Sequence, residues 1–290
     1  MVNEHPSLER KSKLPEKKYL FIILIIIVTA VIVYAIAYSY IDKVAEETNS
    51  IVIYGDTRTG HDKHREVVAS ILKKNPKVVF HTGDLVADGT KSDQWDVFNE
   101  ITSDLMGIVD FYPTIGNHEN NSQLYFDNFT LPGNERWYTV EYEGVTFIVL
   151  DSTSDLDNTS EQFAWFESEL MTKSIDDKLI TIFHHPIYTI GKHKDDEMDI
   201  ADTIVPLFEK YGVDVVFNGH NHNYERSVVN GIQYIVAGGG GAPLYDQERE
   251  NSHNVVFEKK YHFCLLEITG DSLKMTAYDT ESNILDAILI

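Results

Sequence analysis

Five short β-like runs of the chain each end in a residue that can bind a metal ion. They lie at 51–54, 78–81, 109–115, 179–183 and 213–217. The carboxyl ends of strands in an α/β sheet lie on one edge, so the residues that follow them converge there. These residues are ligand types for borderline divalent and trivalent metals, so the sequence predicts a site for two ions. They are two carboxylates, one amide and three imidazoles: Asp56, Asp84, Asn117, His184, His220 and His222.

The order of the elements predicts an α/β fold. Helical periodicity over 64–74, 95–105 and 200–211 alternates with the strand-like runs, which favours parallel β-α-β units. The runs 136–142 and 145–150 predict a hairpin that turns at Glu143-Gly144. The last third is mostly strand-like, with runs at 231–236, 261–268 and 273–278. Two mixed sheets packed together, with helices outside, accommodate both patterns.

The first fifty residues predict a membrane anchor. Residues 19–41 are nearly all apolar and are long enough to span a bilayer. Lys and Arg dominate the flank before this segment and acidic residues the flank after it, so we expect a cytoplasmic basic tail at 1–18. A linker at 42–50 then leads to an extracytoplasmic domain at 51–290. A cleaved signal peptide is the alternative, because Ala35-Ile36-Ala37 resembles a cleavage site, but the apolar stretch is long for one.

The charge of the chain restricts its ligands. The formal net charge is −22, so we expect no nucleic-acid binding. Such a surface also repels anionic substrates, and an anion site here must create its own positive field, which bound metal ions would do. The single cysteine, Cys264, lies in an apolar run and is predicted to be a buried thiol.

Five ordered sequence blocks resemble those of the calcineurin-like metallophosphoesterases, and the stretch 219–226 is similar to the purple acid phosphatase branch. The resemblance covers about residues 51–240. It implies a four-layer α-β-β-α sandwich of two mixed sheets, here preceded by one transmembrane helix. It also implies two metal ions (Fe, Mn or Zn) and hydrolysis of phosphate mono- or diesters by metal-activated hydroxide. The blocks are Gly55-Asp56, Gly83-Asp84, Gly116-Asn117-His118-Glu119, His184-His185-Pro186 and Gly219-His220-Asn221-His222.

The resemblance also implies a role for each matching residue. Asp84 bridges the two metals, and Asp56 and His222 complete the ligands of the first. The second metal is held by Asn117, His184 and His220. His118 protonates the leaving oxygen of the substrate, and His185 lies behind the ligands or in the pocket wall.

The chain departs from the family pattern around the first metal. Arg58 stands where many members have a ligating histidine, and Ala87 stands where the purple branch has a tyrosine. The first metal therefore lacks one usual ligand, which His61 or His64 could supply, although a surface position at the start of a helix is the commoner role. We predict that Arg58 binds substrate phosphate, because a guanidinium matches phosphate geometry; a surface ion pair is the alternative.

The sequence leaves two interpretations open for each of two loops and gives one prediction for a further histidine. Gly238-Gly239-Gly240-Gly241 lacks the Lys-Ser/Thr of a P-loop, and is either a close backbone passage near the metal loops or a flexible turn. The segment 188–198 either overhangs the site and selects substrates or is a solvated loop. His81, within a strand-like run, is predicted to be a core residue.

The sequence thus predicts a membrane-anchored, extracytoplasmic phosphoesterase with two metals. A catalytically silent, anchored binding protein that keeps the fold is the rival, and the complete set of ligand-type residues argues against it. The substrate stays open among monoesters, cyclic nucleotides, nucleotide pyrophosphates and lipid headgroups, and nothing in the sequence selects an oligomeric state.

Overall fold

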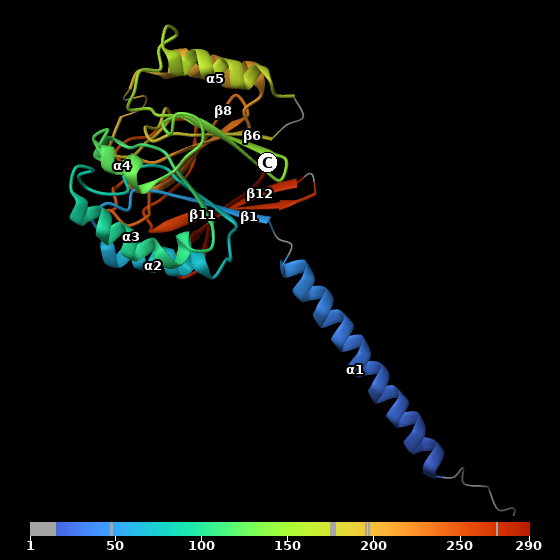
Figure 1. Cartoon of the computed structure of the whole chain (residues 1–290). Coiled ribbons are helices and arrows are strands. Elements are labelled where there is room, and N and C mark those ends of the chain that lie inside the picture. The colour runs from blue at the N-terminus through green and yellow to red at the C-terminus, as the bar shows by residue number, and fades with distance from the viewer. Residues whose placement is uncertain (1–15, 47–48, 175–177, 195, 197, 271) are drawn as a thin grey trace, which may run out of the picture. The chain divides into compact units, whose positions relative to one another are not determined.

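The computed structural model describes residues 16–46, 49–174, 178–194, 196, 198–270 and 272–290. The chain divides into two units, Met1–Thr48 and Asn49–Ile290. The first contains the helix α1 (Glu16–Glu46), drawn in blue in Figure 1. Its segment Tyr19–Tyr38 has a mean hydropathy of 3.2 and is long and apolar enough to cross a membrane, a test that a signal sequence also passes.

The first sheet of the second unit has six strands in the order β13-β12-β11-β1-β2-β3. The three strands that begin the domain pair in parallel, and the three last strands of the chain add to them in antiparallel fashion. The strands are β1 (Asn49–Tyr54), β2 (Val78–His81), β3 (Asp110–Pro113), β11 (His262–Thr269), β12 (Ser272–Asp279) and β13 (Ile284–Leu289).

The second sheet has seven strands in the order β10-β8-β9-β7-β6-β5-β4. Its centre, β5 to β6 to β7 to β9, is parallel, and the hairpin β4-β5 and the strands β8 and β10 pair in antiparallel fashion. The predicted hairpin is confirmed, and Glu143 and Gly144 form its turn with φ of 50° and 79°. The strands are β4 (Tyr138–Tyr142), β5 (Val145–Val149), β6 (Lys178–Ile182), β7 (Val215–Asn218), β8 (Tyr224–Val229), β9 (Ile232–Ala237) and β10 (Asn254–Glu258).

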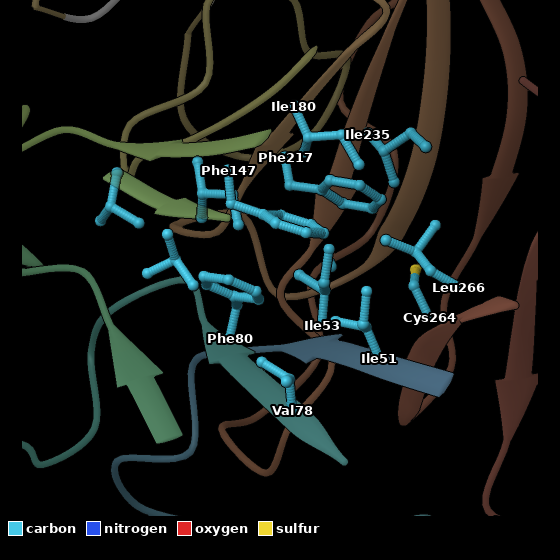
Figure 2. Close-up of a cluster of buried hydrophobic side chains, with 14 of the residues drawn as sticks. Ile51, Ile53, Val78, Phe80, Phe147, Ile180, Phe217, Ile235, Cys264 and Leu266 are labelled. Atoms are coloured by element: carbon cyan, nitrogen blue, oxygen red, sulfur yellow. The ribbon is translucent and has the colours of Figure 1, made fainter. Parts of the chain in front are cut away.

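The two sheets pack face to face through apolar side chains that alternate along their strands. Figure 2 shows Ile53, Phe80 and Cys264 from one sheet opposite Phe147 and Phe217 from the other. The rings of Phe80 and Phe147 stack at 4.5 Å, and Cys264 is a buried free thiol, as predicted. This interface forms the main core of the domain.

Helices cover the outer face of each sheet. α2 (His61–Leu72) and α3 (Ser92–Met106) pack on the first sheet, and α5 (Glu161–Met171) and α6 (Ala201–Tyr211) on the second. Their apolar residues recur at helical spacing, so one face of each helix is buried. The four-layer α-β-β-α sandwich of two mixed sheets is confirmed. The short helices η1 (Asn117–Glu119) and α4 (Gln123–Asn128) follow β3.

Candidate metal centre

Three strand-end residues adopt a left-handed backbone conformation. φ is 59° at Asp56 after β1, 57° at Asp84 after β2 and 68° at His220 after β7. The conformation costs a non-glycine residue about 1–2 kcal/mol, so contacts between the loops must hold it. Asp56 N donates to Gly83 O at 3.0 Å, and the two carboxylate oxygens of Asp56 accept from His220 N at 3.1 and 3.0 Å. Loops from both sheets therefore meet at the carboxyl ends of their parallel strands.

Most of the glycines beside these residues allow close approach. A Cβ at Gly219 would lie 2.6 Å from Oδ2 of Asp56, and one at Gly116 would lie 2.4 Å from Oδ1 of Asp84. Of the glycines that precede ligand-type residues, only Gly83 has a positive φ, of 91°. The strand-end loops are thus packed too tightly to admit side chains at these points.

One group of ligand atoms gathers around His184. Its Nδ1 lies 2.8 Å from the carbonyl oxygen of Thr82, which can only accept, so Nδ1 carries the proton and Nε2 offers a lone pair. Asn117 Oδ1, His220 Nδ1 and Asp84 Oδ1 lie 3.1, 3.2 and 3.4 Å from that Nε2. Lone pairs that converge in this way in a buried site are stabilised by a cation.

The other group joins Asp56, Asp84 and His222, whose ligand atoms all lie within 4.8 Å of one another. It is called the first group below, because it would hold the first metal, and the group around His184 is called the second. His222 Nδ1 lies 2.8 Å from the carbonyl oxygen of Pro243, so its Nε2 also offers a lone pair and lies 3.6 Å from Asp56 Oδ1. Asp84 belongs to both groups, because its Oδ1 faces His184. The donor sets, mixed nitrogen and oxygen with one shared carboxylate, fit two adjacent metal ions.

Burial sets the protonation states of these ligands. It lowers the pKa of His184 and His220 well below the usual value and that of His222 to about 4, so the three rings are neutral near pH 7. Burial raises the pKa of the Asp56 carboxyl, and the neighbouring Asp84 carboxyl raises it further. A bound cation would relieve this repulsion and keep both carboxylates ionised.

Glu119 holds the two loops that follow β2 and β3. Its Oε2 accepts from Gly116 N at 2.7 Å and from Asp84 N at 3.0 Å, and its Oε1 accepts from Leu85 N at 2.9 Å. Burial, and then the Asp84 charge, raise its pKa to about 8. The sequence block that contains Glu119 was recognised, but this positioning role depends on contacts that only the folded chain makes.

His118 lies at the edge of the site. Its Nδ1 donates to the carbonyl oxygen of Ala87 at 2.7 Å, and its backbone N donates to Asp84 Oδ1 at 3.1 Å. Nε2 points back toward the site, 3.9 Å from Asp84 Oδ2, and 29% of the side chain is exposed. The ring is therefore fixed at one nitrogen and presents the other beside the candidate ligands.

With this geometry, comparison with known proteins identifies the family. The family model described as calcineurin-like phosphoesterase matches residues 50–224, more than half of the chain. The chain belongs to the calcineurin-like phosphoesterase family. Its five sequence blocks supply the residues that meet at the strand ends, and its two buried groups of ligands are consistent with a dinuclear centre.

Curated relatives in this family are purple acid phosphatases. Purple acid phosphatase 18 of Arabidopsis thaliana is 33% identical over 186 residues, which are 55% of this chain and 42% of the relative. Purple acid phosphatase 15 of the same plant is 26% identical over 238 residues, 66% of this chain and 44% of the relative. The chain thus spans roughly two fifths of the length of these curated relatives.

Two solved structures share the fold. A purple acid phosphatase from yellow lupin (Lupinus luteus) seeds matches with a TM-score of 0.75 and 20% identity, over 84% of this chain and 54% of its own. GAP50, described as the anchor in the inner membrane complex of Plasmodium, matches with a TM-score of 0.71 and 16% identity, over 83% of this chain and 88% of its own. At these identities the likeness shows the fold alone.

Arg58 lies inside the site of this calcineurin-like phosphoesterase. Its Nε is 3.4 Å from Asp84 Oδ2, and its Nη2 is 3.2 Å from His222 Nε2 and 3.4 Å from the Tyr245 hydroxyl. Only 17% of the side chain is exposed. Arg58 thus pairs with a buried carboxylate among the candidate ligands rather than with a surface group, and its binding of substrate phosphate stays a prediction.

The two histidines considered as substitute ligands lie elsewhere. His64 is buried in α2, where its ring packs 5.7 Å from that of Phe98 and its Nε2 is 3.5 Å from the Tyr54 hydroxyl. His61 is exposed at the first position of α2. The surface position expected for His64 is wrong, since its ring is buried in the layer between α2 and the sheet, away from the candidate ligands, whereas that expectation is confirmed for His61. His81 is buried in β2, as predicted, with Nε2 3.3 Å from Thr57 Oγ1.

Three aromatic side chains at the site were not assigned a metal-site role from the sequence. His193 lies with its ring 3.8 Å from that of His220, and the ring of Tyr245 stacks on His222 at 4.0 Å. The possible ligand atoms of His184, His185 and His220 lie within 4.8 Å of one another, so His185 borders the group around His184. The family resemblance placed His185 beside the ligands, and the segment 188–198, which contains His193, was predicted as a loop that could overhang the site; its residues 195 and 197 lie outside the described part.

The glycine run passes directly behind the metal loops. Gly240 N donates to Gly55 O at 2.7 Å, and a Cβ at Gly238 would lie 2.2 Å from Asn221 O. The interpretation as a close backbone passage is confirmed. This passage also brings Tyr245, a few residues further on, to the first ligand group.

Proposed function

We propose that the chain is a dinuclear-metal phosphoesterase that hydrolyses phosphate mono- or diesters. The convergence of oxygen and nitrogen ligand atoms on His184 Nε2, with Asp84 shared between two groups, carries the proposal. Two ions held by these groups would lower the pKa of a water molecule and polarise the phosphoryl oxygens. The first ion would be held by Asp56, Asp84 and His222, and the second by Asp84, Asn117, His184 and His220.

The remaining site residues would act on the substrate. His118 Nε2 faces the site and is positioned to give a proton to the leaving oxygen, because its Nδ1 is fixed by Ala87 O. Arg58 would bind a phosphate oxygen through its fork of N–H groups. Glu119 keeps in place the backbone at Asp84 and the backbone just before Asn117, through the N–H groups of Asp84 and Gly116.

The activity test uses the full chain in detergent, stripped of metal by chelation and reloaded with Mn, Fe or Zn. We expect turnover of an aryl phosphate or a bis-aryl phosphate, and its loss in Asp84→Asn and His222→Ala. The matched control is Asp88→Asn, because Asp88 is a partly exposed carboxylate in the same loop that accepts from Thr90 N at 3.0 Å. Metal binding without turnover of any ester would instead support a catalytically silent binding protein.

We also propose that α1 anchors the enzyme with its domain outside the cytoplasm. The helix is apolar over Tyr19–Tyr38, and its basic flank precedes its acidic flank in the sequence. A phosphoester in that compartment would be the substrate, and the membrane the second partner. Cleavage of α1 as a signal sequence is the alternative, which mass measurement of the mature chain decides.

A further inference from the structure

We infer that Arg58 competes with the first metal ion for its ligands, and that a phosphate group releases Arg58 and so loads the ion. The inference rests on the proposed function only for the substrate class, a phosphate ester. Its core is a single atom, Nε2 of His222, which both the guanidinium and a metal ion require.

The competition follows from the lone pairs of His222. Because Nδ1 donates to Pro243 O at 2.8 Å, the neutral ring has one free lone pair, on Nε2. Arg58 Nη2 lies 3.2 Å from that atom, and a guanidinium can only donate. A metal ion at the first group needs the same lone pair. The hydrogen bond and the coordinate bond therefore exclude each other.

The contacts of Asp84 also place the Arg58 guanidinium at the first group. Arg58 Nε lies 3.4 Å from Oδ2, while Oδ1 faces His184 in the other group at 3.4 Å. In the part of the chain that the structure describes, the Arg58 guanidinium contacts Asp84 Oδ2, His222 and Tyr245. The guanidinium thus opposes an ion at the first group and leaves the second group accessible.

A phosphate group provides the release. An ion at the first group would repel a guanidinium a few ångströms away, so the loaded state needs an anion between them. The two edges of a guanidinium match two oxygens of a tetrahedral phosphate. Arg58 is partly exposed, and Lys192 Nζ lies 4.4 Å from the Tyr245 ring beside it, so a second cation borders the same space. Phosphate and first metal should therefore each raise the affinity for the other.

The test is a metal titration of the full chain in detergent after chelation, by calorimetry and by metal analysis after gel filtration. We expect one Mn²⁺ or Zn²⁺ to bind tightly and a second to bind weakly in chloride buffer. Inorganic phosphate at the same ionic strength should tighten the second ion by at least about tenfold, within the usual range of coupling between sites. Two equally tight ions that ignore phosphate would overturn the inference.

Variants separate competition from a missing ligand. Arg58→Ala removes the competitor without adding a ligand, so the second ion should bind more tightly and phosphate should lose its effect. Arg58→His adds an imidazole and should give two tight ions. Arg65→Ala is the matched control, because Arg65 forms an exposed pair with Glu100 at 2.8 Å, and it should titrate like the wild type. An Arg58→Ala protein that keeps the weak site would overturn the inference.

The titration measures metal affinity, so its result does not depend on the turnover of an ester. A protein that hydrolyses no ester but shows phosphate-dependent loading keeps the inference and loses the proposed function. A protein that hydrolyses esters but binds two ions tightly and independently of phosphate keeps the proposed function and loses the inference. Should the variants fail to fold, a wild-type protein whose second ion ignores phosphate would still overturn the inference.

Discussion

At the scale of single residues, neighbours in the sequence have different predicted roles because their side-chain polar atoms face different partners. His118 and Asn117 are adjacent, yet Asn117 Oδ1 lies 3.1 Å from the free nitrogen of His184, whereas His118 donates Nδ1 to a backbone carbonyl. The first is placed among candidate metal ligands and the second at the edge of the site. We therefore expect a substitution of Asn117 to affect metal binding and a substitution of His118 to affect the rate.

We predict that His118→Ala keeps its metal and loses rate. Loss of a general acid typically costs about 10²–10⁴-fold in turnover. The loss should shrink for esters whose leaving groups are strongly acidic, because these depart without a proton. Steady-state rates on a series of aryl phosphates, together with the metal content, check this. A His118→Ala protein that loses its metal would place His118 among the ligands instead.

At the scale of elements, one side chain joins the loop between β7 and β8 to the loop after β6. Asn221, between two candidate ligands, accepts from His193 N at 2.9 Å and donates to Thr189 Oγ1 at 2.8 Å. Glu225 accepts from Ile190 N at 2.9 Å and from Thr189 Oγ1. Arg249 donates to His193 O at 2.6 Å on the same loop. These bonds hold His193 against His220.

We predict that Asn221→Ala loosens the loop 189–193 without removing metal. Leaving buried partners unpaired costs about 1–3 kcal/mol of stability, and the displaced His193 should raise KM more than it lowers kcat. Amide hydrogen exchange of the loop, metal content and KM are the measurements. Asn223→Ala is the matched control, because the buried amide of Asn223 makes no side-chain hydrogen bond among the described residues. Equal effects of the two variants would contradict the assignment.

The helix α2 contributes a dependence of stability on pH. Burial lowers the pKa of His64 to about 3, below its usual value near 6.5. Between these values the unfolded chain binds a proton that the folded chain does not, so stability falls as the pH falls from about 6.5 toward 3. The slope is about 1.4 kcal/mol per pH unit for one proton.

We therefore predict that His64→Gln reduces the slope of the free energy of unfolding against pH by the amount expected for about one proton, although it lowers stability at pH 7. Urea unfolding of the full chain in detergent at several values from pH 7 to pH 4 measures it. His253→Gln, at an exposed position, is the control for loss of an imidazole at the surface. An unchanged slope in His64→Gln would show that the buried ring is not the source.

At the scale of the whole molecule, the net charge bears on substrate approach and the apolar helix bears on location. The net charge of −22 repels phosphate esters, so the candidate metal ions and Arg58 supply the local positive field. We predict that protease added to intact cells or spheroplasts removes the domain 49–290 while a cytoplasmic marker survives. Digestion only after lysis would contradict the proposed orientation.

Mass measurement of the mature chain addresses the same helix. We expect residues 1–41 to remain attached and the protein to stay in the membrane fraction after alkaline extraction. A mature chain that begins after Ala37 would identify the helix as a signal sequence and leave the domain free of its anchor.

The sequence by itself determined the features that depend on local periodicity. Strand-like runs, helical spacing and the residues at strand ends can be read along the chain, because a period of two or 3.6 and a nearby turn are local properties. These were enough to predict an α/β fold and the set of candidate Asp, Asn and His ligands, whereas two sheets only accommodated the pattern and the four-layer sandwich came from the family resemblance. The two-sheet packing also explains why strands in different sheets deliver their ends to one site.

Only the tertiary structure decided which atoms face each other across that site. Arg58 meets His222 over 164 positions and Tyr245 over 187, so no local pattern predicts either contact. His64 and Arg58 are six positions apart, yet helix packing buries the first against Phe98, and the loop after β1 turns the second into the metal centre. The reason is physical: side-chain direction at a loop is fixed by segments that arrive from elsewhere in the chain, once the core between the sheets has formed.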